Sequence, residues 1–254
     1  MQIGICTSVE TFESAPAGVD YLEPTVAELL CPDQSQQESA RRGQHAALAV
    51  RAANCLIPGQ LKTTGPQSDP QQLDAYMQTV LDRAAAAGLD VLVFGSGGSR
   101  RLPDGFDPAE ATDQLADHLR RWAPLASGAG VIICIEPLSR GDCNIIHTVD
   151  EAAELARRVD HTHIRVLCDT YHMSRNDDAP EAIVRAGDLI AHVHVADPGG
   201  RAPLLKGGAD QRPFFAALKQ VGYTGGVSIE ATWQDIHQQL PEAIGQLRRQ
   251  IDSA

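Results

Sequence analysis

The clearest pattern along the chain is a series of short apolar runs rich in valine and isoleucine. They lack the strict alternation of apolar and polar positions found in half-exposed strands, and they are too short for helices. Runs of this kind are typical of parallel strands buried on both faces. The pattern predicts eight strands, at Gln2–Ser8, Val19–Glu23, Asn54–Ile57, Val91–Gly95, Val131–Glu136, Ile164–Asp169, Leu189–Val195 and Gly226–Glu230.

Between these runs, apolar residues recur every three or four positions, which predicts amphipathic helices. Asp69-Pro70 and Asp107-Pro108 each combine a capping side chain with a proline suited to the first helical turn, and Gly88 is a stop signal. The main helices are expected at Gln36–Ala53, Gln71–Ala87, Asp107–Ser127, Val149–Val159, Pro180–Ala186, Arg212–Val221 and Ile236–Ile251.

Strands and helices alternate along the whole chain without a linker or a break in composition. The helix expected in the first connection, Val9–Gly18, has the weakest pattern. This order predicts an α/β fold, a single (β/α)8 barrel domain covering residues 1–254. Barrels of this type have about 250 residues, so the length agrees.

Four side chains that can bind a metal stand at the ends of consecutive apolar runs. They are Glu136, Asp169, His194 and Glu230, and the gaps between them are 33, 25 and 36 residues. Each gap has about the length of one strand-plus-helix repeat, and parallel barrel strands all end on the same face. Two glutamates, an aspartate and a histidine are suitable ligands for a hard or borderline divalent ion. The pattern therefore predicts a metal site at the barrel mouth.

Two further histidines accompany these ligands. His192 lies on the same run as His194, and we expect the two side chains to point to opposite sides of the sheet. Only one of them would then be a ligand, and His194 lies closer to the end of the strand. His172 follows Asp169 by three residues and is expected to reach the same centre.

The loops after the third and fourth strands contain glycine and basic residues. Gly95–Ser99 lacks the Lys-Ser/Thr pair of a P-loop and does not lead straight into a predicted helix, so we interpret it as a turn that shapes the mouth. Lys62, Arg100 and Arg101 are candidates for binding an anionic group of a substrate, and solvated surface charge is the alternative.

Composition narrows the class of protein. The 43% of hydrophobic residues suffices for a full core, and the net charge of −12 with a pI near 5.1 argues against a nucleic-acid partner. No apolar run approaches the roughly 20 residues of a membrane span, and Met1–Cys6 is interpreted as a strand, not a signal peptide. The six cysteines contain no C-x-x-C pair, which favours reduced thiols. We expect a cytoplasmic protein with no membrane partner, and homo-oligomerisation is left open.

Four segments resemble the xylose-isomerase-like barrel superfamily, and within it the sugar isomerase and epimerase group that includes D-tagatose and D-psicose 3-epimerases. These segments are Ile135–Arg140, Cys168–His172, His192–Asp197 and Ser228–Glu230. The resemblance implies a small-molecule sugar substrate and one divalent ion held by Glu136, Asp169, His194 and Glu230. Mn²⁺ is the first choice, with Mg²⁺, Co²⁺ or Zn²⁺ as alternatives.

The same resemblance implies substrate-binding residues. His172 matches the histidine of an Asp-x-x-His pair, and Asp142 occupies the place of a glutamate six residues beyond the first metal ligand. The family arginine expected six residues after the metal histidine would fall at Gly200, and Arg201 follows one residue later. With Lys62 from the third loop, these residues form the expected substrate contacts.

The expected reaction begins with a metal-chelated carbonyl that acidifies the neighbouring C–H bond. Glu136 and Glu230 would act as paired acid and base on an enediolate intermediate. Return of the proton by the second glutamate epimerises a ketose or keto-sugar, and return to the neighbouring carbon isomerises it. An inosose (keto-inositol) isomerase is an alternative, and loss of a β-hydroxyl would give an inosose dehydratase. A sugar-binding relative without turnover, or a barrel with merely structural carboxylates, is the non-enzymatic alternative.

Endonuclease IV, in the same superfamily, is a further alternative. Such nucleases use three zinc ions and need additional histidines after the third and fourth strands. Here these loops read Pro58-Gly59-Gln60 and Gly95-Ser96-Gly97, and no Asp-x-His pair occurs near Asp210-Gln211-Arg212. The sequence therefore favours one metal and no DNA partner.

Overall fold

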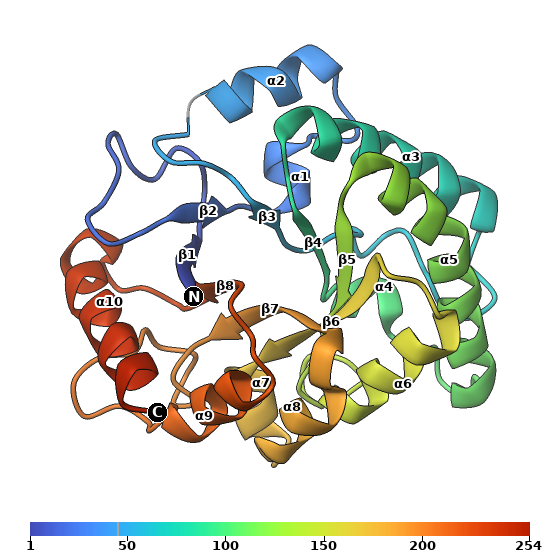
Figure 1. Cartoon of the computed structure of the whole chain (residues 1–254). Coiled ribbons are helices and arrows are strands. Elements are labelled where there is room, and N and C mark those ends of the chain that lie inside the picture. The colour runs from blue at the N-terminus through green and yellow to red at the C-terminus, as the bar shows by residue number, and fades with distance from the viewer. Residues whose placement is uncertain (45) are drawn as a thin grey trace.

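A computed structural model describes residues 1–44 and 46–254 as a barrel of eight parallel strands (Figure 1). Neighbouring strands follow the order β2-β1-β8-β7-β6-β5-β4-β3, and every pair is parallel. The predicted (β/α)8 barrel is confirmed. The strands are β1 (Gln2–Cys6), β2 (Tyr21–Glu23), β3 (Ala52–Ala53), β4 (Val91–Phe94), β5 (Ile132–Ile135), β6 (Ile164–Asp169), β7 (Ile190–Val195) and β8 (Gly226–Ile229).

Isolated bridges between the segments around β2 and β3 nearly close the barrel. Leu22 pairs with Val50 and Thr25 pairs with Asn54, both in parallel. The Leu22 N–H also donates to the Ala49 carbonyl at 2.9 Å. Closure places the carboxyl ends of all eight strands around one mouth.

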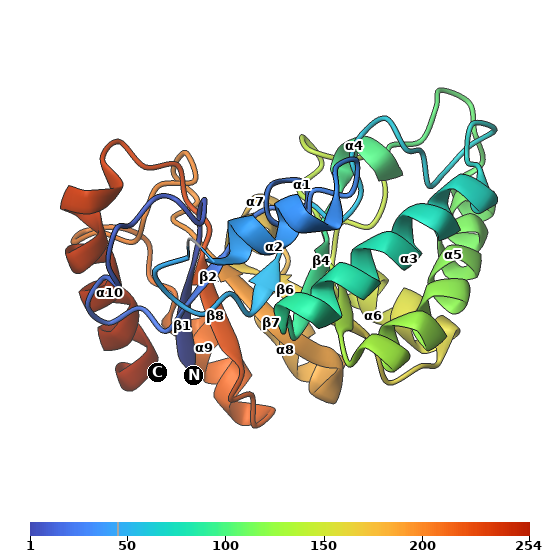
Figure 2. The same ribbon diagram turned by 90° about the horizontal axis from the view of Figure 1, so that it is seen from above.

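Helices surround the strands, as Figure 1 and the perpendicular view in Figure 2 both show. Short helices follow directly after β2, β4 and β6, and these three were not predicted. Among the described residues, no helix is long and apolar enough to cross a membrane. The helices are α1 (Val26–Leu29), α2 (Gln36–Gln44), α3 (Pro70–Ala87), α4 (Gly97–Arg100), α5 (Pro108–Ala129), α6 (Val149–Val159), α7 (Thr170–Arg175), α8 (Glu181–Ala186), the 3-10 turn η1 (Gly187–Leu189), α9 (Arg212–Gln220) and α10 (Ile236–Ser253).

The predicted helix boundary signals are confirmed on the two long helices α3 and α5. The Asp69 carboxylate accepts from two backbone N–H groups in the first turn of α3, and Asp107 accepts from one in α5. Each helix has its predicted proline in the first turn. Gly88 ends α3 with φ of 71°, a left-handed conformation that suits a residue without a Cβ.

The helix predicted over Gln36–Ala53 was too long. It ends at Gln44, and His45, which falls within the prediction, lies outside the described residues. The alanine-rich segment that follows has helical propensity, but the Leu22–Val50 bridge pulls it into the barrel. Strand pairing in the barrel therefore outweighs the helical propensity of this segment.

The third strand and the first connection were also predicted incorrectly. Strand β3 occupies Ala52–Ala53 and not Asn54–Ile57, because Cys55 has φ of 52° and breaks the extended geometry. The connection Val9–Gly18 contains turns and bends and no helix. Its side chains still contribute to the core, since Val9 is fully buried.

The apolar core has two parts that correspond to the two faces of the strands. The larger part joins strand residues such as Val193 to helix residues such as Trp122, so it lies between barrel and helices. In the smaller part, the buried residues are on strands and include Val93, Cys134 and Leu167. It therefore fills the barrel interior, as expected for a closed barrel of eight strands.

His192 and His194 both point into the barrel interior, so the expectation that they face opposite sides was wrong. Successive side chains alternate along a strand, and residues two positions apart therefore share a face. Their Nε2 atoms each lie 2.8 Å from an oxygen of Glu23, and all three side chains are almost fully buried. His194 lies near the mouth and His192 lies one layer deeper.

Candidate metal centre and substrate cavity

The structure brings together the four predicted ligands at the barrel mouth. Glu136 and Glu230 immediately follow β5 and β8, Asp169 ends β6, and His194 is the second-last residue of β7. All four side chains point to the interior. One ligand atom from each lies within 4.8 Å of the others. The four residues predicted from the spacing of the strand ends therefore form a compact group of three carboxylates and one imidazole.

The ligand atoms facing this point are buried and have no hydrogen-bond partner among the described residues. They are Glu136 Oε1, Asp169 Oδ2, His194 Nδ1 and Glu230 Oε2. His194 Nδ1 lies 2.7 Å from Glu230 Oε2, an ion-pair distance without hydrogen-bond geometry. Buried carboxylate oxygens without hydrogen-bond partners, such as Glu136 Oε1 and Asp169 Oδ2, are costly, and a cation between them would remove that cost. Oxygen-rich ligands with one imidazole fit a divalent ion such as Mn²⁺ or Mg²⁺.

The remaining atoms of two ligands are held by the surrounding backbone. Asp169 Oδ1 caps α7 by accepting the Tyr171 N–H at 2.7 Å, which leaves Oδ2 facing the centre. The Glu136 carboxylate lies over Gly95, where a Cβ would fall 1.6 Å from Oε2. A side chain at position 95 would therefore clash with the Glu136 carboxylate. Fully buried Arg100 donates to the carbonyls of Phe94 and Glu136, joining the ends of β4 and β5.

Glu23, at the end of β2, was missed by the sequence analysis. Its Oε1 lies 2.8 Å from His194 Nε2, and its Oε2 accepts from Ser228 at 2.6 Å and lies 2.8 Å from His192 Nε2. Tyr21 extends this network through Ser228. Burial alone would raise the pKa of Glu23, but the neighbouring imidazoles lower it well below its usual range. Ionised Glu23 therefore holds the Nε2–H of His194 and leaves Nδ1 available to a metal ion.

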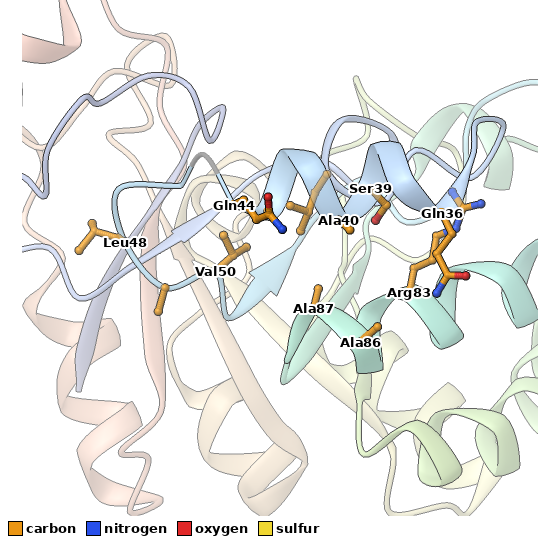
Figure 3. A pocket seen from close by; sticks show the side chains of 12 residues that line it. Gln36, Ser39, Ala40, Gln44, Leu48, Val50, Arg83, Ala86 and Ala87 are labelled. Carbon is orange, nitrogen blue, oxygen red and sulfur yellow. The ribbon is translucent and has the colours of Figure 1, made fainter.

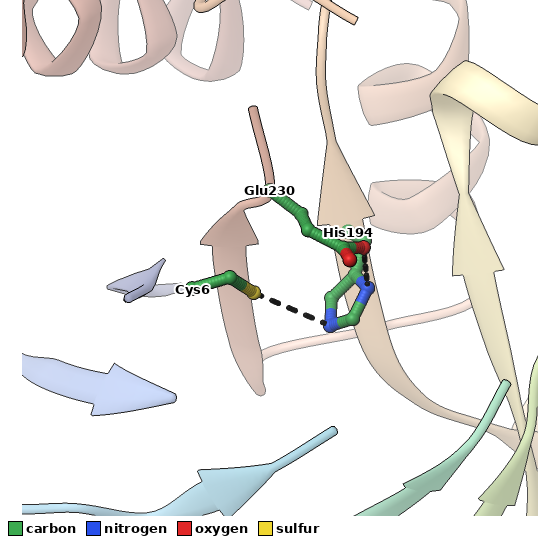
Figure 4. Close-up of side chains that lie close together, drawn as sticks. All are labelled: Cys6, His194 and Glu230. Carbon is green, nitrogen blue, oxygen red and sulfur yellow. Dashed lines mark hydrogen bonds and ion pairs between the residues drawn. The ribbon is translucent and has the colours of Figure 1, made fainter. Parts of the chain in front are cut away.

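Figure 4 shows Cys6 and Glu230 on different edges of the His194 ring. The Cys6 sulfur lies 3.9 Å from Nε2, and Glu230 approaches Nδ1. Burial disfavours protonation of this imidazole, but Glu23, Cys6 and Glu230 outweigh it and raise the pKa of His194 well above its usual range. The centre therefore has an excess of negative charge that favours a cation.

His172 is buried beside the ligands with a defined tautomer. Its Nδ1 accepts the Ser139 N–H at 3.0 Å, so the proton of the neutral ring is on Nε2. Nε2 lies 3.5 Å from Asp169 Oδ2 and faces the cavity. His172 therefore presents a hydrogen-bond donor beside the candidate ligands.

Two of the other predicted substrate contacts, Asp142 and Arg201, line the same cavity. The Asp142 carboxylate accepts from the Ser139 hydroxyl and is half-exposed. Arg201 Nη2 lies 2.6 Å from Glu230 Oε2, and its guanidinium stacks 5.0 Å from the Tyr171 ring centre. Burial opposes its charge, but Glu230 and Asp169 hold the pKa of Arg201 above its usual range.

The other predicted basic contacts bind backbone at the rim. The Lys62 amine donates to the carbonyls of Gly59 and Gly98, and Lys62 does not line the cavity. Arg101 donates to the Asp142 carbonyl at 2.7 Å. Both side chains therefore form hydrogen bonds to the backbone of neighbouring loops.

Two adjoining cavities open around Glu230. The β5-side cavity has a volume of about 260 Å³ and includes Glu136 and His172, whereas the β1-side cavity measures about 330 Å³ and includes Glu23. Four residues line both, namely Asn54, Cys55, Arg201 and Glu230. Together they form a site of ordinary size for a small molecule.

A larger cavity, of about 460 Å³, lies away from this chemistry between α2 and α3 (Figure 3). Small side chains such as Ala40 and Ala87 line much of it. Arg83 is its charged lining residue, and its guanidinium donates to the carbonyls of Leu30 and Gln34. The described residues that line this cavity therefore include no group of metal ligands or proton carriers.

Comparison with known proteins identifies a family with this barrel fold. The profile of the family described as xylose isomerase-like TIM barrel matches residues 15–251. The D-psicose 3-epimerase of Ruminiclostridium cellulolyticum is 31% identical over 125 residues, 46% of this chain but only 40% of that protein. The L-ribulose 3-epimerase of Methylomonas sp. is 26% identical over 88% of this chain and 77% of its own length. A D-allulose 3-epimerase structure from Methylomonas sp. superposes with a TM-score of 0.81, at 22% identity and 98% coverage of both chains.

Proposed function

Because the chain belongs to the xylose isomerase-like TIM barrel family, we propose that it is a divalent-metal-dependent epimerase or isomerase of a ketose or keto-sugar. Relatives named as 3-epimerases of psicose and ribulose support this class of reaction. The observation that carries the proposal is the group of four buried ligand atoms without hydrogen-bond partners, two of them on glutamates from different strands.

Glu136, Asp169, His194 and Glu230 would hold the ion, with Mn²⁺ the first choice. When bound, the ion supplies Lewis-acid polarisation of the substrate carbonyl, which acidifies the neighbouring C–H bond. Ionised Glu23 keeps the His194 ring in the ligating tautomer. Metal binding lowers the basicity of a carboxylate, so the two glutamates act as weak bases on an acidified carbon.

Proton transfer is assigned to Glu136 and Glu230. Strands β5 and β8 are separated in the barrel by β6 and β7, so the two carboxylates approach from different sides. One glutamate removes the proton beside the carbonyl, and the other returns a proton to the opposite face of the same carbon. His172 orients a substrate oxygen through its Nε2–H, and Arg201 binds a second oxygen beside Glu230.

Glutamate-to-glutamine variants test this division. Glutamine keeps the size and one oxygen ligand but cannot carry the proton. In Glu230→Gln, solvent deuterium should enter one substrate epimer and not the other, and Glu136→Gln should show the reverse. Exchange is followed by NMR in D₂O with Mg²⁺, and metal content is measured in each variant. Equal loss for both epimers with metal bound would indicate a single base and favour the isomerase. Absence of exchange in the metal-loaded wild type would favour a non-catalytic protein.

A further inference from the structure

The β1-side cavity has an unusually polar wall for a small-molecule site. Small-molecule cavities are mostly apolar with a few polar groups. Here Thr7, Ser8, Thr25, Glu28, Asn54 and Thr232 all contribute to the lining, and Ala231 is the lining residue with a purely hydrocarbon side chain. At about 330 Å³ the cavity is at least as large as the β5-side cavity of about 260 Å³. It therefore has room for a second group of the size bound beside the ligands.

Several polar groups on this wall are within reach of a ligand. Asn54 as a residue is only 6% exposed, and its side-chain amide has no hydrogen bond to the described residues, although its backbone closes the barrel against Pro24 and Val26. Half-buried Glu28 and exposed Thr232 also line this wall, with a carboxylate and a hydroxyl that a ligand can reach. The Asn54 amide is thus available to a ligand in the cavity, and a ligand hydroxyl can both donate to it and accept from it.

The charges of this cavity determine which polar ligand it accepts. Glu23, Glu28 and Glu230 line it, and Arg201, its basic lining residue, already lies beside Glu230 and Asp169. A phosphate or carboxylate on the ligand would meet the Glu28 carboxylate, while Arg201 is already engaged by Glu230. Neutral hydroxyl groups can instead donate to these carboxylates. The wall therefore favours a neutral ligand rich in hydroxyls.

We propose that the substrate is a keto-glycoside whose neutral second sugar unit occupies the β1-side cavity. This inference rests on the proposed function, since the reacting keto-sugar would lie in the β5-side cavity next to Glu136 and His172. Glu230 lines both cavities, so the reacting carbon lies at their junction. The Asn54 amide, which also lines both, binds hydroxyls near the glycosidic link.

A matched set of substrates tests this assignment. Solvent deuterium incorporation is measured by NMR with the Mg²⁺-loaded protein and D-psicose, 3-keto-D-glucose or 3-keto-trehalose. The last two differ by one glucose unit. We expect kcat/KM for exchange to be about tenfold higher for 3-keto-trehalose than for 3-keto-D-glucose, the effect of one or two hydrogen bonds. Asn54→Leu and Thr232→Val should each reduce this ratio, whereas Thr112→Val on the outer helix α5 should leave it unchanged.

The possible results separate the two proposals. Equal kcat/KM for 3-keto-D-glucose and 3-keto-trehalose, or a preference that survives both cavity variants, overturns the second-unit site. Exchange with D-psicose would then leave the proposed epimerase function intact. No exchange with any of the three sugars, in protein shown to bind Mg²⁺, overturns the proposed function and this inference with it.

Discussion

The position of Glu23 leads to a specific prediction about metal affinity. Glu23→Gln keeps the shape of a fully buried side chain but replaces one oxygen by an NH₂ group and removes the charge. If NH₂ faces His194, the ring must accept at Nε2, and its proton moves to Nδ1, the atom assigned to the metal. If NH₂ faces His192 and Ser228, the correct tautomer survives, but the charge that strengthens His194 as a ligand is lost.

The size of the effect follows from the bond that is changed. Groups that hold the second nitrogen of a metal-binding histidine typically account for about 10- to 100-fold in metal affinity. We therefore expect Glu23→Gln to weaken Mn²⁺ binding by that factor, about 1.4–2.7 kcal/mol. Because the four ligands remain, excess Mn²⁺ should restore most of the turnover. Asp169→Ala removes a ligand itself and should not be rescued.

Calorimetric titration with Mn²⁺ measures the dissociation constants, and circular dichroism establishes that each variant is folded. Tyr76→Phe is the control, because it removes a tyrosine hydroxyl that donates to the Leu56 carbonyl, outside the Glu23 network. It should keep the wild-type constant. Nitrogen-15 NMR of the Mg²⁺-loaded wild type should show His194 protonated at Nε2 only. A folded Glu23→Gln protein with wild-type affinity, or a wild-type His194 protonated at Nδ1, would refute the reasoning.

Three further predictions concern single residues. His172→Ala should retain the metal measured by titration and lose turnover, since only its Nε2–H toward the substrate is removed; loss of metal in this variant would assign it to the ligands. Gly95→Ala should displace Glu136 and lower both metal affinity and turnover, and unchanged values would contradict the close approach. Burial and Arg121 lower the pKa of His118 to about 4 from 6.5, so acidification between these values destabilises the wild type as only the unfolded state gains a proton. Urea unfolding of His118→Gln should show a weaker decline between pH 7 and 5.

The fold could be predicted because its signals are local and repeated. Buried parallel strands show as short apolar runs, and Asp69 and Gly88 mark helix ends through backbone geometry within a few residues. The third strand was misplaced because its boundaries depend on pairing across the barrel. Neither the Leu22–Val50 bridge nor the left-handed conformation of Cys55 has a clear local signal.

The predicted ligands came together because strand ends in a barrel always converge. Glu23 had the same signal, an acidic residue at the end of an apolar run, but its strand is only three residues long. The error over His192 came from assigning the wrong side-chain period, and the correct period would have revealed a second interior histidine. The contacts of Arg201 depend on loop conformation, which the residue spacing does not determine.

The barrel mouth contains buried charged side chains and unfavourable backbone conformations. Glu23, Glu136 and Asp169 are buried carboxylates, and both Cys55 and Arg201 have left-handed backbone conformations. Buried charges and such conformations cost stability and persist where the surrounding structure enforces them. Here the larger apolar core lies between strands and helices, away from the mouth. Apolar burial between the strands and the helices stabilises the fold. The residues at the strand ends can therefore be buried carboxylates, which would destabilise an apolar core.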